Sequence, residues 1–189
     1  MPLDAPRIRI EILEALGHVQ AEVASYFGSL GAEFNQRTGD AWTPAEHLTH
    51  LVTSVNAVAR GLAAPKLLLR LRFGRARAPS RSYVQVRDAY RAALAAGGKA
   101  SGAFVPPPEV VSADDAGRRR AEILARWERA NARLRGGLER WTEPQLDGIR
   151  MPHPLLGRLT TREMLFFTLY HNQHHVAAVQ RRLAAPVAP

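Results

Sequence analysis

The sequence contains no cysteine among its 189 residues. Disulfide bonds, thiolate metal ligands and a cysteine nucleophile are therefore excluded. Any metal ion would have to be held by histidine, aspartate or glutamate. The N-terminal stretch MPLDAPRIRIEILEAL carries acidic residues within its apolar pattern, unlike a secretory leader. We expect a cytoplasmic protein.

Long apolar runs are also missing, and every extended apolar segment carries charges. We therefore expect no membrane span. The sequence has no glycine-rich phosphate loop and no useful alternation of polar and apolar residues, so strands are not predicted. Hydrophobic residues make up 46% of the chain, which is enough for one folded domain over residues 1–189.

Acidic residues are absent between Lys66 and Arg87, and this stretch supplies most of the net charge of +9. It contains seven basic residues: Lys66, Arg70, Arg72, Arg75, Arg77, Arg81 and Arg87. Such a run attracts anions, and Arg70, Arg72 and Arg75 are candidates for binding an anionic ligand. Few aromatic side chains lie in the same stretch, so it offers no set of rings on which nucleic-acid bases could stack. A nucleic-acid interface is therefore the less favoured interpretation.

Apolar residues recur at helical spacing in five segments: 6–30, 43–62, 82–96, 112–141 and 160–183. Two of these begin with a capping box, in which a threonine and a glutamate three residues later satisfy each other's backbone N–H groups. The pairs are Thr43 with Glu46 and Thr160 with Glu163. Ser112 is the expected start of the fourth segment.

The connections between these helices are long. An arginine-rich connection covers about 64–82, as a loop or a short helix, and a proline-rich one covers about 104–111. Together the segments predict an all-α four-helix bundle with a long crossover connection and one or two extra short helices. The apolar run LLLRLRF within the first connection would be an exposed patch in a monomer, so we expect a homodimer.

Three of the seven histidines lie within HNQHH, residues 171–175. On a helix His175 is only about 40° from His171, on the apolar face, and His174 is at its edge. A buried imidazole needs a partner, and a divalent metal ion accepts neutral imidazole nitrogens. The pair is equally compatible with polar packing, because it lacks the glutamate of a protease motif.

A third histidine ligand has to come from another segment. The apolar stripe of segment 43–62 lies about 80° from His47 and about 140° from His50, so helix geometry slightly prefers His47. His153 lies in a connection and is a candidate to line the mouth of the site. His18 is interpreted as a surface histidine.

Two motifs resemble those of a known family. WTPAEHLTHL, residues 42–51, is similar to the first signature of the DinB-like superfamily, and GRLTTREMLFFTLYHNQHH resembles its closing signature. The middle stretch YRAALAAGGKASGAFVPPP is similar to one branch. The resemblance implies a four-helix bundle that binds zinc or nickel through three histidines. By position these are His50, His171 and His175. His47 and His174 would then support or line the site, and Ala178 replaces a glutamine found in many members.

The resemblance implies more than one function. Some relatives are thiol-dependent S-transferases or isomerases, others look like hydrolases, and others have no known activity. We therefore expect a divalent-metal-dependent enzyme for a small-molecule substrate, with a low-molecular-weight thiol as a candidate cofactor. The alternative is a non-catalytic, metal-stabilised bundle. No acid or base is apparent, although Asp40 and Asp147 lie in connections that could reach the site.

Overall fold

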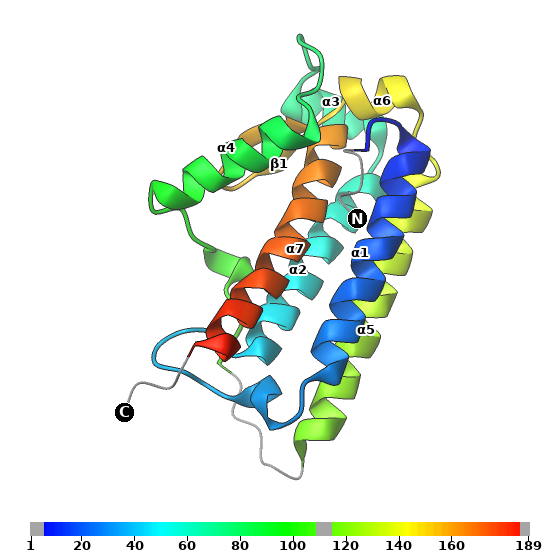
Figure 1. The fold of residues 1–189 in the computed structure, drawn as a ribbon. Coiled ribbons are helices and arrows are strands. Elements are labelled where there is room, and N and C mark those ends of the chain that lie inside the picture. Colours follow the sequence, from blue (N-terminus) through cyan, green and yellow to red (C-terminus); the bar gives the residue numbers. More distant parts are fainter. Residues whose placement is uncertain (1–5, 109–114, 186–189) are drawn as a thin grey trace.

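The computed structural model describes residues 6–108 and 115–185. Its body consists of four long helices (Figure 1), which are α1 Arg9–Ser29, α2 Pro44–Ala63, α5 Ala116–Leu138 and α7 Thr161–Ala184. The predicted all-α four-helix bundle is therefore confirmed. Within the described ranges, no helix is both long and apolar enough to cross a membrane.

The four helices are not arranged in sequence order around the bundle. α1 packs against α5 and α7, and α2 packs against the same two helices, so the consecutive helices α1 and α2 are diagonal partners. Figure 1 shows that α2 and α5 run in the same direction. The chain between them must therefore return along the bundle, which is the long crossover expected from the sequence.

The core forms from apolar residues at helical spacing, as in α1, whose buried positions include Ile12, Leu16, Val19, Val23 and Phe27. Burial of such side chains is the main favourable contribution to folding. Two buried tryptophans also satisfy their polar N–H groups. Trp127 donates to the carbonyl of Gln20 at 3.1 Å, and Trp141 donates to that of Leu62 at 3.0 Å.

Both predicted capping boxes are present. The Thr43 hydroxyl accepts the N–H of Glu46 at 3.1 Å, while the Glu46 carboxylate accepts the N–H of Thr43 at 2.8 Å. Thr160 and Glu163 form the same reciprocal pair at the start of α7. The expected start of α5 at Ser112 lies outside the described residues, and the helix is described from Ala116.

The crossover contains α3 Lys66–Phe73, α4 Tyr83–Ala95 and the 3₁₀ turn η2 Gly102–Phe104. The arginine-rich connection is thus partly helical. A second 3₁₀ turn, η1 Ala32–Asn35, follows α1, and α6 Glu143–Gly148 follows α5. Three shorter α-helices are therefore described, where the sequence predicted one or two. α4 packs against α7 and so encloses a space beside the bundle.

A hairpin between α6 and α7 was not predicted. β1 Arg150–His153 and β2 Gly157–Thr160 pair in antiparallel register, with Met151 opposite Leu159. The expectation of no strands was wrong here, because two four-residue strands, of which β1 contains Pro152, carry little periodic signal. Gly157 turns the chain at a φ of 72°, a left-handed conformation that glycine adopts without strain. The hairpin places β1 against α3 and α7.

Candidate metal centre

α7 supplies two histidines one helical turn apart. The Nε2 atom of His175 lies 3.2 Å from that of His171. The two residues are 8% and 4% exposed, because this face of α7 is covered by α2 and α4. Their rings therefore meet each other rather than water.

α2 brings a third imidazole to the same place. The Nε2 atom of His50 lies 3.0 Å from that of His171, and His50 is only 5% exposed. Each of the three residues offers one ring nitrogen, and these nitrogens all lie within 4.8 Å of one another. The structure thus groups the three histidines that the family resemblance indicated, and His47, which helix geometry preferred, is not in this group.

The crossover fixes the orientation of His50. Its Nδ1 atom lies 2.7 Å from the carbonyl oxygen of Phe104. A carbonyl can only accept, so Nδ1 carries the hydrogen and the lone pair of a neutral ring is on Nε2, facing His171. Such an outer hydrogen bond is typical of histidines that ligate metals.

His47 and Trp42 orient His175 in a similar way. The Nδ1 atoms of His47 and His175 are 2.7 Å apart, so one of the rings donates to the other. When His175 is the donor, its Nε2 lone pair faces His171. The Trp42 ring lies nearly parallel to that of His175, with an angle of 12° and a centroid distance of 6.4 Å. His47 is therefore in direct hydrogen-bonding contact with His175, outside the group of three.

Burial keeps these imidazoles neutral. Desolvation lowers the pKa of His47 to about 4. It also lowers the pKa values of His171 and His175 well below their usual range, with further contributions from the neighbouring imidazoles. The pKa of His50 is lowered by the same cause. At neutral pH the cluster therefore presents uncharged nitrogen donors.

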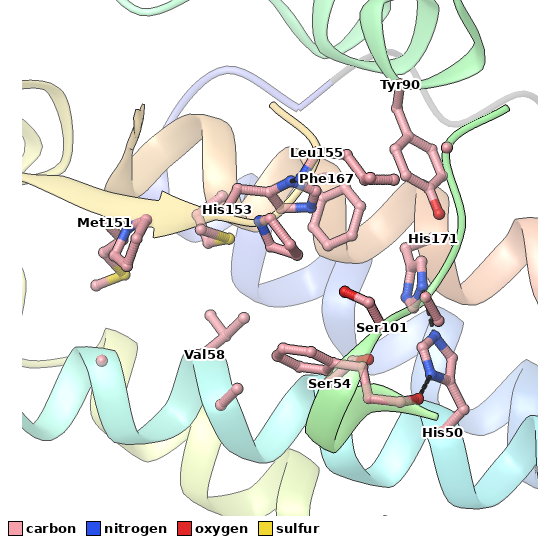
Figure 2. Close-up of a pocket in the computed structure, with 18 of the residues that line it drawn as sticks. His50, Ser54, Val58, Tyr90, Ser101, Met151, His153, Leu155, Phe167 and His171 are labelled. Carbon is pink, nitrogen blue, oxygen red and sulfur yellow. Dashed lines mark hydrogen bonds between the residues drawn. The ribbon is translucent and has the colours of Figure 1, made fainter. Parts of the chain in front are cut away.

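A large cleft opens beside the cluster, with a volume of about 1390 Å³. Figure 2 shows His50 and His171 at one side of it and Val58 and Met151 at the other. The walls come from α2, α3, α4, β1, α7 and the segment 98–105, and no aspartate or glutamate of the described residues lines them. The cluster is thus accessible to a ligand of considerable size.

The comparison with known families decides the family of the chain. Residues 15–179 match the sequence profile of the DinB superfamily. This chain belongs to the DinB superfamily. The matched region contains His50, His171 and His175, so the whole cluster lies within the part that the family shares.

Among solved structures, this DinB superfamily protein is similar to TT2238, which is described as a four-helix bundle protein. The sequence identity is 21% and the TM-score is 0.55, over 92% of this chain and 98% of that chain. At this identity the similarity shows a shared fold alone. No curated protein matches the chain.

The donor set of the DinB superfamily protein fits a divalent metal ion. Zinc binds imidazole nitrogens at about 2.0–2.1 Å, so two nitrogens on one ion are about 3–3.5 Å apart. The distances of 3.0 and 3.2 Å around the Nε2 atom of His171 fall in this range. If the Nε2 atom of His171 carried a hydrogen, it could donate a good hydrogen bond to His50 or to His175, but not to both. A metal ion between the three rings would accept the lone pairs of all three nitrogens.

Two further candidate histidines line the cleft. His174 is half-buried, and its ring centroid is 5.6 Å from that of His175. His153 is buried on β1, and its Nδ1 atom accepts the backbone N–H groups of Leu155 and Leu156 at 3.1 and 3.0 Å. In the neutral ring Nε2 therefore carries the hydrogen, and His153 is a hydrogen-bond donor.

The three candidate arginines differ in position. Arg72 lines the cleft, whereas Arg70 and Arg75 are exposed and lie outside its lining. The two aspartates considered as acids or bases are also outside it. Asp40 is exposed, and Asp147 accepts a hydrogen bond from the guanidinium of Arg162 at 2.7 Å.

The sequence analysis missed Tyr90 and the carbonyl of Phe104. Tyr90 lies on α4 with its ring centroid 6.0 Å from that of His171, and Figure 2 shows its hydroxyl pointing toward this histidine. Burial raises the pKa of Tyr90 to about 12, so the hydroxyl stays protonated. Both residues lie within the stretch 90–108, whose similarity to one branch of the family was the available signal.

Proposed function

We propose that this protein is a divalent-metal-dependent enzyme of the thiol S-transferase, isomerase or hydrolase type. His50, His171 and His175 would hold zinc or nickel. The observation that carries the proposal is the meeting of three neutral Nε2 donors at the wall of a large cleft. A bound ion would lower the pKa of a thiol or a water molecule beside it.

The residues around the cluster have separate tasks. The Phe104 carbonyl and His47 hold the rings of His50 and His175 in place. The protonated Tyr90 hydroxyl and the Nε2–H of His153 offer hydrogen bonds to a substrate oxygen. The low-molecular-weight thiol remains a proposal, supported by the cationic Arg72 in the cleft wall, which suits its carboxylates.

The alternatives have weaker support. A purely structural metal site needs no cleft of about 1390 Å³ beside it. Nucleic-acid binding is disfavoured because several basic residues of the 66–87 run have partners within the chain. Arg81 pairs with Glu163 at 3.0 Å, and Lys66 lies over the ring of Trp141 at 5.0 Å. A cytoplasmic location stays a prediction that cell fractionation would test.

Elemental analysis of the purified, untagged protein tests the proposal. We expect about one zinc or nickel ion per chain. The protein loaded with cobalt should then change its visible absorption when a low-molecular-weight thiol is added, because the thiol enters next to the ion. An ion that is bound without any response to thiols, and without turnover of thiol or ester substrates, would leave the non-catalytic alternative in place.

We also propose that a second copy of the chain covers the outer face of α3. Leu67, Leu68 and Leu71 are 68%, 54% and 76% exposed, which is unusual for three leucines on one short helix. Sedimentation equilibrium should show a dimer that Leu68→Arg/Leu71→Arg converts to a monomer. Val84→Arg, an exposed apolar position on α4, is the control and should stay dimeric. A monomeric parent protein at high concentration would contradict this proposal.

A further inference from the structure

The cleft is longer than the histidine cluster requires. His50 and Arg60 both line it, and they lie ten residues apart on α2. At a rise of 1.5 Å per residue this corresponds to about 15 Å of helix. In Figure 2 the wall continues from His50 past Ser54 to Val58, with Met151 on the opposite side. An occupant that fills the cleft is therefore elongated.

The walls of the cleft between His50 and Arg60 are mostly apolar. They include Val58, Leu69, Phe73, Met151, Leu155 and Phe167. These residues come from α2, α3, β1, the hairpin turn and α7, so they surround the cleft from several sides. Apolar walls favour an apolar occupant, because its removal from water is the main source of affinity.

The charges in the cleft are all of one sign. Arg60, Arg72 and Lys99 line it, and none of them forms an ion pair with a residue in the described ranges. Arg60 lies ten residues beyond His50, in the last turn of α2, and Arg72 lies on α3, the next helix along the chain. Guanidinium groups bind carboxylates and other oxyanions through paired hydrogen bonds. The end of the cleft away from His50 is thus suited to an anion.

We propose that the cleft binds an elongated, mainly apolar molecule that carries one carboxylate or a similar anionic group. Arg60 and Arg72 hold the anionic group, the apolar chain lies along Val58 and Met151, and the other end of the molecule reaches the histidine cluster. This assignment rests on the proposed function, for which it names the class of the substrate that reacts at the metal site.

Calorimetric titration with simple amphiphiles tests the proposal. The probes are butyrate, octanoate and decanoate, with decanol and decylamine as partners of the same chain length. Affinity should rise roughly tenfold or more from butyrate to octanoate, because additional methylene groups become buried. Decylamine should bind roughly tenfold or more weakly than decanoate, since it brings a positive charge to Arg60 and Arg72.

Variants locate the two ends of the ligand. Arg60→Ala/Arg72→Ala should weaken decanoate binding roughly tenfold and leave decanol unaffected. Arg126→Ala/Arg129→Ala removes the same charge from α5, which contributes no residue to the cleft, and should bind decanoate normally. Ser54→Trp fills the middle of the cleft and should abolish decanoate binding while the metal content stays unchanged.

The outcomes separate this proposal from the proposed function, because metal content is measured independently. A protein that holds its metal ion but binds decanoate no better than decylamine would overturn the ligand assignment alone. Decanoate binding that survives Arg60→Ala/Arg72→Ala but disappears with chelator would place the carboxylate at the histidines, and the assigned orientation would be wrong. A purified parent protein that contains no metal ion would instead count against the proposed function.

Discussion

His171→Ala is expected to abolish metal binding. The Nε2 atom of His171 lies 3.0 Å from the Nε2 atom of His50 and 3.2 Å from that of His175, so the substitution removes the central one of the three proposed ligands. Metal content should fall from about one ion per chain to nearly none. A ligand that binds only the native state at a thousand times its dissociation constant stabilises it by about 4 kcal/mol. For a domain of this size that raises the melting temperature by about 8–16 °C.

The measurement compares each protein with and without zinc, so that changes in packing caused by the substitution cancel. The parent protein should show the shift in melting temperature, and His171→Ala should show almost none. His18→Ala is the matched control, because His18 is exposed on α1 and takes no part in the cluster. A variant lacking His171 that still bound one zinc ion with the full shift would place the ion elsewhere.

The helices were predictable because their signals are local. Thr43 with Glu46 and Thr160 with Glu163 form the reciprocal bonds that their spacing indicates, and these bonds fix the starts of α2 and α7. The helical segments and the long connections between them then predicted a four-helix bundle with a crossover, and the family resemblance implied the same fold. The hairpin 150–160 lacked such a signal, because its strands are too short for a period of two to be visible.

The choice between His47 and His50 shows where helix geometry fails. A helical wheel assumes one buried and one exposed face. At the start of α2 every residue from Pro44 to Val52 is buried. This part of the helix has no exposed face, so the helical wheel cannot exclude either histidine as a ligand. Both histidines are buried, and they differ only in their partners. His50 meets His171 directly, whereas His47 bonds to the far side of the His175 ring.

Other parts of the site depend on contacts between distant segments. The carbonyl of Phe104 is a backbone atom, so no residue type marks it as a partner of His50. Tyr90 reaches the cluster because α4 folds back onto α7. Arg60 lines the cleft because residues of α3 and β1 complete the wall beside α2. Such features follow from the crossover, whose path no local pattern specifies.

Acid should destabilise the metal-free protein steeply. Burial lowers the pKa values of His47 and His153 to about 4, from an ordinary value near 6.5. Between these values the unfolded chain binds protons that the folded chain does not, so the free energy of unfolding falls as pH falls. This stabilisation is fully present above pH 6.5 or so and is lost on acidification toward 4. Each histidine contributes about 1.4 kcal/mol per pH unit in the steep range.

His47 and His153 together therefore remove about 3 kcal/mol per pH unit, and His171 and His175, whose pKa values are lowered by burial as well, add to the same slope. A domain typically has only about 5–15 kcal/mol to lose, so we expect unfolding near pH 5. Urea unfolding at several pH values between 7.5 and 5 measures the slope. His153→Gln should reduce this slope by about 1.4 kcal/mol per pH unit, because one fewer proton is bound on unfolding. Equal free energies of unfolding at pH 7 and pH 5 would mean that the folded protein accepts these protons, and the buried, neutral state of the histidines would then be wrong.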